Sequence, residues 1–185
     1  MVFIIIVVVV AVVGISLAAM FNSLVRLNQQ SDEAFSDITV QLKRRYDLIP
    51  NLVNTVKGYA AHESSVFENV TAARANALNA QGVAETAKAD NAFTQTMKSL
   101  FAVAENYPDL KTTKSFQDFQ TQIEGTENRI NVARRDYNGS VNTYNQKVRL
   151  FPNNIFAGIL GYHVKGYYKA DAGAEKNPDI HFNIK

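Results

Sequence analysis

The stretch that decides the fold runs from Gln41 to Val53 and reads QLKRRYDLIPNLV. It places three consecutive cations, Lys43 to Arg45, and then Pro50 inside a segment that otherwise follows the pattern of one long helix. A proline within a helix removes one backbone hydrogen bond and costs about 3 kcal/mol. Because the apolar pattern continues past the proline, we predict a kink near Pro50, with a helix break there as the alternative.

Residues with heptad spacing extend on both sides of this stretch. One set, seven residues apart, is Phe21, Asn28, Phe35, Leu42, Ile49 and Val56. The second set is Leu24, Ser31, Ile38, Arg45, Leu52 and Tyr59. Such spacing indicates a helix that buries one seam against a partner helix. The pattern continues to the NAQG stretch at residues 79–82, so we predict one helix over residues 22–80.

Two further helices are predicted after this stop. The first covers residues 84–105 and ends before Pro108, which cannot continue a helix. The second covers residues 112–151, where the residues spaced by seven are Phe116, Ile123, Ile130, Tyr137, Tyr144 and Phe151. Helices with apolar stripes must bury them against one another. The predicted fold is therefore all-α, with residues 22–151 forming an elongated antiparallel helical bundle or a long coiled-coil hairpin.

The N-terminal stretch, residues 1–21, reads MVFIIIVVVVAVVGISLAAMF and contains no charged side chain. As a helix it would span roughly 30 Å, which matches the hydrocarbon core of a bilayer. We predict a transmembrane anchor; the alternatives are a cleaved signal peptide and a buried core helix. Arg26 and the cations at Lys43 to Arg45 follow this segment, so the N-terminus is predicted outside and the bundle in the cytoplasm.

The C-terminal tail, residues 152–185, mixes aromatic residues with glycines and lysines. It is predicted either to cap the end of the bundle or to touch the membrane interface, where aromatic residues and lysines concentrate. The alternation of Ile180, Phe182 and Ile184 with polar residues predicts a short strand near its end.

The composition excludes several classes of function. The formal charge of +2 provides no field of one sign that would hold nucleic acid. The chain has no cysteine, which removes disulfides and thiolate chemistry. The histidines, His62, His163 and His181, lack a second ligand at helical spacing, and no catalytic motif is present. We therefore predict no enzymatic activity, no catalytic residue, no metal and no cofactor.

Polar residues on the helix seams predict a structural cluster. Arg45 lies on the seam, where an unpaired charge is costly, so it should meet an acid on a neighbouring helix, either Glu105 or Glu127. Arg134, one heptad after Glu127, would extend this pairing, and seam tyrosines need hydroxyl partners. We favour a role in fixing helix register over ligand binding. The predicted cluster is Gln41, Arg45, Glu105, Glu127, Arg134, Tyr137 and Tyr144.

Three glycines are predicted to lie on the exterior of the helices. Gly58, Gly125 and Gly139 each follow a main seam residue by two positions. Glycine in a helix costs up to about 1 kcal/mol relative to alanine, so these positions form a possible assembly face for another copy. The alternative is that they are tolerated surface glycines.

Several motifs resemble those of one protein family. The stretch QLKRRYDLIPNLV, the later AENYPDL and the segment EGTENRINVARRDYNGSVNTYNQKVRLFP are similar to the LemA family of bacterial membrane proteins. The resemblance covers nearly the whole chain after residue 21. It implies one N-terminal transmembrane helix carrying a cytoplasmic helical bundle at the bacterial inner membrane, with no established enzymatic activity.

These observations predict a non-enzymatic, single-pass scaffold that self-associates and organises the membrane or membrane protein partners. Its predicted partners are membrane lipid through residues 1–21, further copies of the chain and, as a further option, other membrane proteins, but not nucleic acid. The alternative is a cytoplasm-facing sensor or partner-binding module that acts in the envelope stress response.

Overall fold

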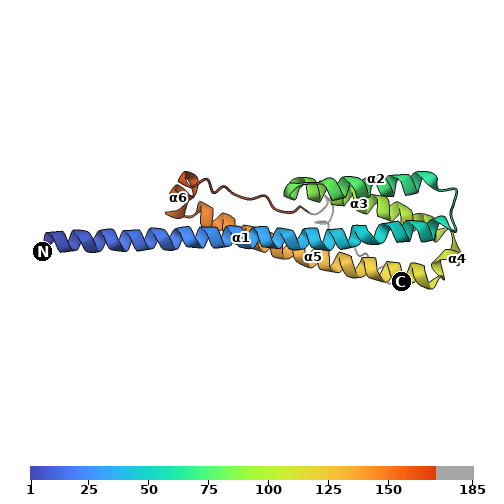
Figure 1. Cartoon of the computed structure of the whole chain (residues 1–185), viewed down its shortest axis with the longest axis horizontal. Coiled ribbons are helices and arrows are strands. Elements are labelled where there is room, and N and C mark those ends of the chain that lie inside the picture. Colours follow the sequence, from blue (N-terminus) through green and yellow to red (C-terminus); the bar gives the residue numbers. More distant parts are fainter. Residues whose placement is uncertain (170–185) are drawn as a thin grey trace, which may run out of the picture. The chain divides into compact units, whose positions relative to one another are not determined.

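The computed structural model describes residues 1–169, and in this range the chain is helical with no strand. Figure 1 shows the helices, which are α1 (Val2–Lys57), α2 (Ser64–Asn79), α3 (Gly82–Glu105), α4 (Pro108–Lys111), α5 (Lys114–Arg149) and α6 (Asn153–Ile159). The all-α prediction is confirmed for these residues. The short strand predicted between Ile180 and Ile184 lies outside the described range.

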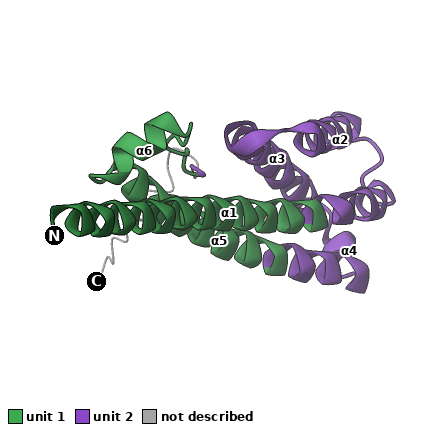
Figure 2. Cartoon of the chain, turned by 60° about the vertical axis from the view of Figure 1, so that its left-hand side comes forward, with its two compact units in different colours: residues 1–44, 125–167 green, residues 45–124, 168–185 purple. Residues whose placement is uncertain are grey.

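The helices belong to two compact units, which Figure 2 shows in different colours. Unit 1 comprises residues 1–44 and 125–167, whereas unit 2 comprises residues 45–124 and, of the described tail, residues 168 and 169. Both long helices, α1 and α5, contribute to each unit. The predicted division into an anchor, a bundle and a tail follows other boundaries and stays a prediction.

Helix α1 differs from the sequence prediction at its end. Pro50 lies inside α1, so the alternative of a break at this residue is wrong. The predicted single helix over residues 22–80 is also wrong, because α1 ends at Lys57 and α2 begins at Ser64. Gly58 is a poor helix former, and the chain turns directly after it. The Ala60 amide donates to the Val56 carbonyl at 2.9 Å, and the Ala60 side chain is buried in this turn.

In unit 1, α1 packs antiparallel against α5. Near the N-terminal end, Leu24 of α1 shares a buried cluster with Tyr144 and Val148 of α5. Further along α1, the Phe35 ring lies 5.8 Å from the ring of Tyr137, which precedes Tyr144 in the sequence. The predicted heptad residues form this core: Leu24, Ile38, Leu42, Ile130, Tyr137, Val141 and Tyr144 are all buried.

In unit 2, α2 and α3 pack side by side, and α4 follows α3 after a short turn. The predicted stop at NAQG is confirmed, because α2 ends at Asn79 and α3 begins at Gly82, whose φ of +72° favours glycine. Helix α4 was not predicted; Pro108 occupies its first turn, where a missing N–H costs nothing. The most deeply buried apolar side chains of this unit are Ile49, Leu52, Val56, Val70, Phe93, Leu100 and Leu110.

Helix α6 lies in the tail and was not predicted either. Its inner face buries Asn153 and Ala157, and Ala157 joins the cluster of Leu24, Tyr144 and Val148 in unit 1. The tail therefore packs on α1 just after its apolar segment and on the C-terminal part of α5. The predicted roles of the tail, a bundle cap or a membrane contact, stay predictions.

Candidate functional site

The first functional element is the exposed N-terminal part of α1. Its most apolar window of 18 residues has a mean hydropathy of 3.2, and none of it is buried by other parts of the protein. The hydroxyl of Ser16 donates to the Val12 carbonyl at 2.8 Å, so this polar group is satisfied within the helix. Among the described helices, α1 alone is long and apolar enough to cross a membrane.

The second element is a buried ion pair in unit 2. Arg45 of α1 donates to the carboxylate of Asp90 of α3; Arg45 is 3% exposed and Asp90 is fully buried. The Arg45 guanidinium carbon also lies 5.1 Å from the centre of the Phe93 ring. Such a pair is strongly destabilised when one partner is removed, because the other charge is then left buried.

Two tyrosines complete the surroundings of Asp90. The Tyr168 hydroxyl donates to one carboxylate oxygen at 3.1 Å, and the Tyr46 hydroxyl lies 3.3 Å from the other. We name Arg45, Tyr46, Asp90 and Tyr168 the Asp90 cluster. The carboxylate of Asp90 accepts from the other three members with little contact to solvent, so the arrangement favours one register between α1, α3 and the tail.

The buried Tyr46 of this cluster should make the stability of the fold decrease at alkaline pH. Burial, and then the charge of Asp90, raise the pKa of Tyr46 well above its usual value of 10.0. An unfolded tyrosine loses its proton near that pH while the folded one keeps it, so unfolding releases a proton. The free energy of unfolding should therefore fall as the pH rises above 10, by up to about 1.4 kcal/mol per pH unit.

Replacement of the tyrosine isolates this contribution. We expect the free energy of unfolding of Tyr46→Phe to fall less steeply than that of the wild type between about pH 10 and pH 11. Urea unfolding at a series of pH values measures both slopes. Equal slopes in the two proteins would contradict the protonated state that we assign to Tyr46.

Pro50 affects the backbone next to the Asp90 cluster. Because proline has no N–H, it cannot donate to the carbonyl of Tyr46, four residues earlier, as another residue in the helix would. The structure supplies a substitute: the Nε of Arg74 in α2 donates to this carbonyl at 2.7 Å. The guanidinium of Arg74 also lies 3.7 Å from the Asp47 carboxylate. Pro50 thus leaves the Tyr46 carbonyl of α1 free to accept a hydrogen bond from Arg74 of α2.

This substitution of one donor for another can be tested with a double-mutant cycle. Arg74→Ala should lower the free energy of unfolding by about 1–3 kcal/mol, since it leaves the Tyr46 carbonyl without its donor. In a Pro50→Ala background the loss should be smaller, because the backbone amide of the introduced alanine can donate to that carbonyl. Urea unfolding of the four proteins gives the coupling energy. Strictly additive losses would show that Arg74 acts independently of the proline.

The third element is a polar clamp in unit 1 that holds the tail. The Asn145 side chain of α5 donates to the Lys165 carbonyl at 2.9 Å and accepts from the Lys165 amide at 2.8 Å. The Lys165 ammonium bonds to Ser31 at 2.6 Å and to Asp32 at 2.5 Å, both on α1. Lys165 therefore attaches the tail segment to both long helices of unit 1, to α5 through its backbone and to α1 through its ammonium group.

The two seam tyrosines of α5 belong to the same region. The Tyr144 hydroxyl donates to the His163 carbonyl at 3.0 Å, and the Tyr137 hydroxyl donates to the Gly166 carbonyl at 2.8 Å. Burial is the main cause that raises the pKa of both hydroxyls. The predicted need for hydroxyl partners is met by backbone carbonyls of the tail.

The predicted cluster residues are distributed over both units. In unit 2, the acid that the structure places on Arg45 is Asp90, which was not a candidate, whereas Glu105 is exposed and pairs with Lys111 at 2.6 Å. Glu105 as the partner of Arg45 is therefore wrong.

The other residues of the predicted cluster belong to unit 1. Glu127 lies 4.0 Å from Arg134, as the heptad spacing indicated. Gln41 lines a shallow groove of unit 1. That all seven residues form one cluster stays a prediction.

The glycine positions have different surroundings. Gly58 lies in the turn after α1, so its predicted place on a helix exterior is wrong. Gly125 and Gly139 lie on α5, and a Cβ atom at either position would meet nothing within 4 Å. Val132, midway between them, is 46% exposed. These three residues form an open stripe on α5, and their role in assembly stays a prediction.

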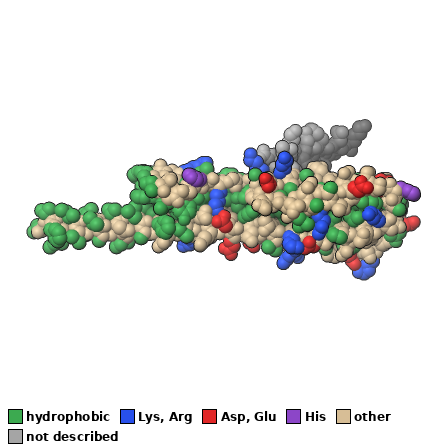
Figure 3. Space-filling model, turned by 45° about the horizontal axis from the view of Figure 1, so that its top comes forward, with side chains coloured by type: hydrophobic (Ala, Val, Ile, Leu, Met, Phe, Trp, Pro, Cys, Tyr) green, Lys and Arg blue, Asp and Glu red, His purple; other side chains and the backbone are tan. Residues whose placement is uncertain are grey.

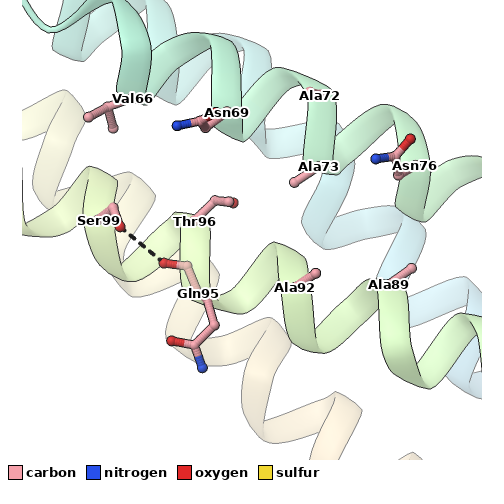
Figure 4. A pocket seen from close by; sticks show the side chains of 10 residues that line it. All are labelled: Val66, Asn69, Ala72, Ala73, Asn76, Ala89, Ala92, Gln95, Thr96 and Ser99. Atoms are coloured by element: carbon pink, nitrogen blue, oxygen red, sulfur yellow. Dashed lines mark hydrogen bonds between the residues drawn. The ribbon is translucent and has the colours of Figure 1, made fainter.

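Unit 2 also has an open groove between α2 and α3, which Figure 4 shows from close by. Alanines, amides and hydroxyls line it, including Ala73 and Asn76 of α2 and Ala92 and Thr96 of α3. No lining residue is titratable, so the groove offers no acid or base for catalysis. In the described part of the chain, no three side chains of His, Cys, Asp or Glu lie close enough to hold a metal.

Comparison with known proteins identifies the family. The model of the LemA family matches residues 34–182 of the chain. Among similar proteins, magnetosome protein MamQ 2 of Paramagnetospirillum magneticum is 25% identical, over 80% of this chain and 64% of its own length. Magnetosome protein MamQ of Magnetospirillum gryphiswaldense is 24% identical, over 83% of this chain and 66% of its own length.

A third relative carries the family name. Protein LemA of Metamycoplasma hominis is 26% identical, over 80% of this chain and 68% of its own length. The chain thus spans about two thirds of the length of the curated relatives that it matches. Because the family model covers more than half of the chain, the chain belongs to the LemA family.

Proposed function

We propose that this chain is a non-enzymatic, single-pass membrane protein that serves as a self-associating helical scaffold. The observation that carries the proposal is the continuity of α1, in which a bare apolar segment and the seam of the bundle belong to one helix. Such a continuous helix would couple the anchor to the helices packed on it. This property suits a scaffold that organises the membrane or membrane protein partners.

The arrangement of the buried polar groups supports a scaffold over a sensor or an enzyme. Asp90 is fully buried, and its carboxylate is occupied by donors from Arg45, Tyr46 and Tyr168. A ligand site needs polar groups that converge on an open cavity, and an enzyme needs titratable groups there. The groove between α2 and α3 is lined by alanines with neutral amides and hydroxyls and has no titratable group.

The proposed location is the bacterial inner membrane, with the N-terminus outside and the helical units in the cytoplasm. Arg26 follows the apolar segment closely and has no charged residue before it. The relatives named magnetosome proteins support an association with a membrane, although that particular organelle is not proposed for this chain.

The proposed assembly surfaces are the anchor and the stripe of Gly125, Val132 and Gly139. Small residues allow another helix to approach closely, and the stripe is open in unit 1. A leucine at either glycine would block this approach without harming the helix, since leucine has the higher helix propensity.

The size of the purified particle tests the proposal. In mild detergent, we expect mass photometry of the full chain to detect a defined oligomer, and a chain that begins at Asn22 to be smaller. Gly125→Leu with Gly139→Leu should reduce the particle size, whereas Asn131→Leu, on another exposed face of α5, should not. Monomers of the full chain would overturn self-association and favour a partner-binding role.

A further inference from the structure

The outer face of the tail in unit 1 is unusually apolar. Helix α6 buries Ala157 but displays Ile155 at 52% exposure and Ile159 at 76%. The segments on either side continue this face, and Phe151 is 79% exposed. Leu150, Leu160 and Val164 are also exposed. Helix α6 therefore packs on unit 1 through alanine and asparagine and turns its isoleucines outward. Its outer face is apolar and has no protein partner in the structure.

This face lies beside the place where α1 leaves its apolar segment. Ala157 of α6 shares a cluster with Leu24, which follows Phe21 by about 4.5 Å along the helix axis. Figure 1 shows α6 next to this part of α1. The headgroup layer adds roughly 5–8 Å on each side of the hydrocarbon core. If residues 2–21 span the core, α6 is therefore at the depth of the headgroups.

The charges of the same region favour a membrane surface. The sequence contains no aspartate or glutamate in residues 1–31 or in residues 137–169. The basic residues of these ranges that belong to unit 1 are Arg26, Lys147, Arg149 and Lys165, and Lys165 is paired with Asp32 of α1. Cations beside an apolar face attract anionic headgroups, each by about 1 kcal/mol near the surface. Figure 3 shows hydrophobic side chains along the anchor and again over the tail beside it.

We infer that the segment from Leu150 to Val164, which we name the tail face, lies in the headgroup layer of the membrane that α1 crosses. The inference rests on the proposed anchor and adds a second lipid contact to it. Continuity with the apolar segment, and the absence of aspartate and glutamate from the tail face itself, favour a lipid surface over a second copy of the chain. The tail face would then fix the rotation and tilt of α1, because it attaches one side of unit 1 to the membrane.

Fluorescence quenching by brominated lipid tests the inference directly, since the chain contains no tryptophan. The full chain with Ile159→Trp is reconstituted into vesicles of phosphatidylcholine and phosphatidylglycerol, with bromine near the headgroup end of the acyl chains. We expect most of the emission to be quenched. The matched control, Val132→Trp, also replaces an exposed apolar residue of unit 1 and should remain unquenched.

The emission of Ile159→Trp distinguishes a lipid contact from a protein contact and from exposure to water. Unquenched emission at a wavelength typical of an apolar site would show that a protein surface, such as a second copy, covers the tail face, and would overturn the inference. Unquenched emission typical of water would overturn it as well. Flotation with the vesicles reports separately on the anchor: quenching can fail while the protein still floats, whereas loss of flotation would refute the anchor itself.

Discussion

Replacement of Asp90 by alanine is expected to lower the free energy of unfolding by about 3–5 kcal/mol. The loss follows from the guanidinium of Arg45, which is 3% exposed and would remain charged and buried without its carboxylate. The hydroxyl of Tyr168 would lose its acceptor too. Urea unfolding followed by circular dichroism measures the effect in the full chain.

Two controls separate the ion pair from other effects of the substitution. Glu85→Ala removes an exposed acid from the same helix and should cost less than about 1 kcal/mol. Asp90→Leu combined with Arg45→Met removes both charges and should recover much of the loss, because no unpaired charge then remains. If Asp90→Ala were no more harmful than Glu85→Ala, the Asp90 cluster would not stabilise unit 2.

Replacement of Asn145 by alanine should release the tail from α5. Asn145 is 4% exposed and is bonded to both the amide and the carbonyl of Lys165. Loss of both bonds should cost about 2–4 kcal/mol. This corresponds to roughly 30- to 1,000-fold faster hydrogen exchange of the amides in residues 163–168. Mass spectrometry of deuterium uptake measures the rates.

Asn142→Ala is the matched control for Asn145→Ala. Asn142 lies one turn earlier on α5 and accepts a single hydrogen bond, from the exposed Tyr167 hydroxyl at 3.3 Å. Its loss should change the exchange rates of the tail by less than about tenfold. Similar exchange in both variants would mean that the tail is held by its apolar contacts and not by Asn145.

Most of the helical seam could be predicted from the sequence. Heptad spacing identified Leu24, Ile38, Leu42 and Ile130, and each of these residues is buried. The spacing did not predict the turn at Gly58, because the apolar pattern continues through it from Val56 to Val66. Local propensity at one glycine, together with the burial of Ala60, overrides a pattern that is interrupted only by Glu63.

The partner of Arg45 was not predicted, because Asp90 was not among the two acids, Glu105 and Glu127, that were considered for it. Asp90 lies seven residues before Met97 and thus on the buried face of α3. A buried acid at a seam position was the signal that could have identified it. Arg74 gave no such signal, since its role depends on a carbonyl that Pro50 leaves free in another helix.

The structure of the tail could not be predicted from residue spacing. Aromatic residues and glycines carry no period, so neither α6 nor the bonds of Lys165 to α1 could be predicted from spacing. These contacts join residues more than a hundred positions apart, and only the antiparallel packing of α1 on α5 brings them together.

We propose that α1 crosses the membrane and carries the helical units on its cytoplasmic side. Because the chain has no cysteine, one introduced at the exposed position Ser115 reports its side of the membrane without background. In intact cells, a maleimide reagent that cannot cross the inner membrane should leave Ser115→Cys unlabelled, and should label it after lysis. Labelling in intact cells would place the bundle outside and contradict the account.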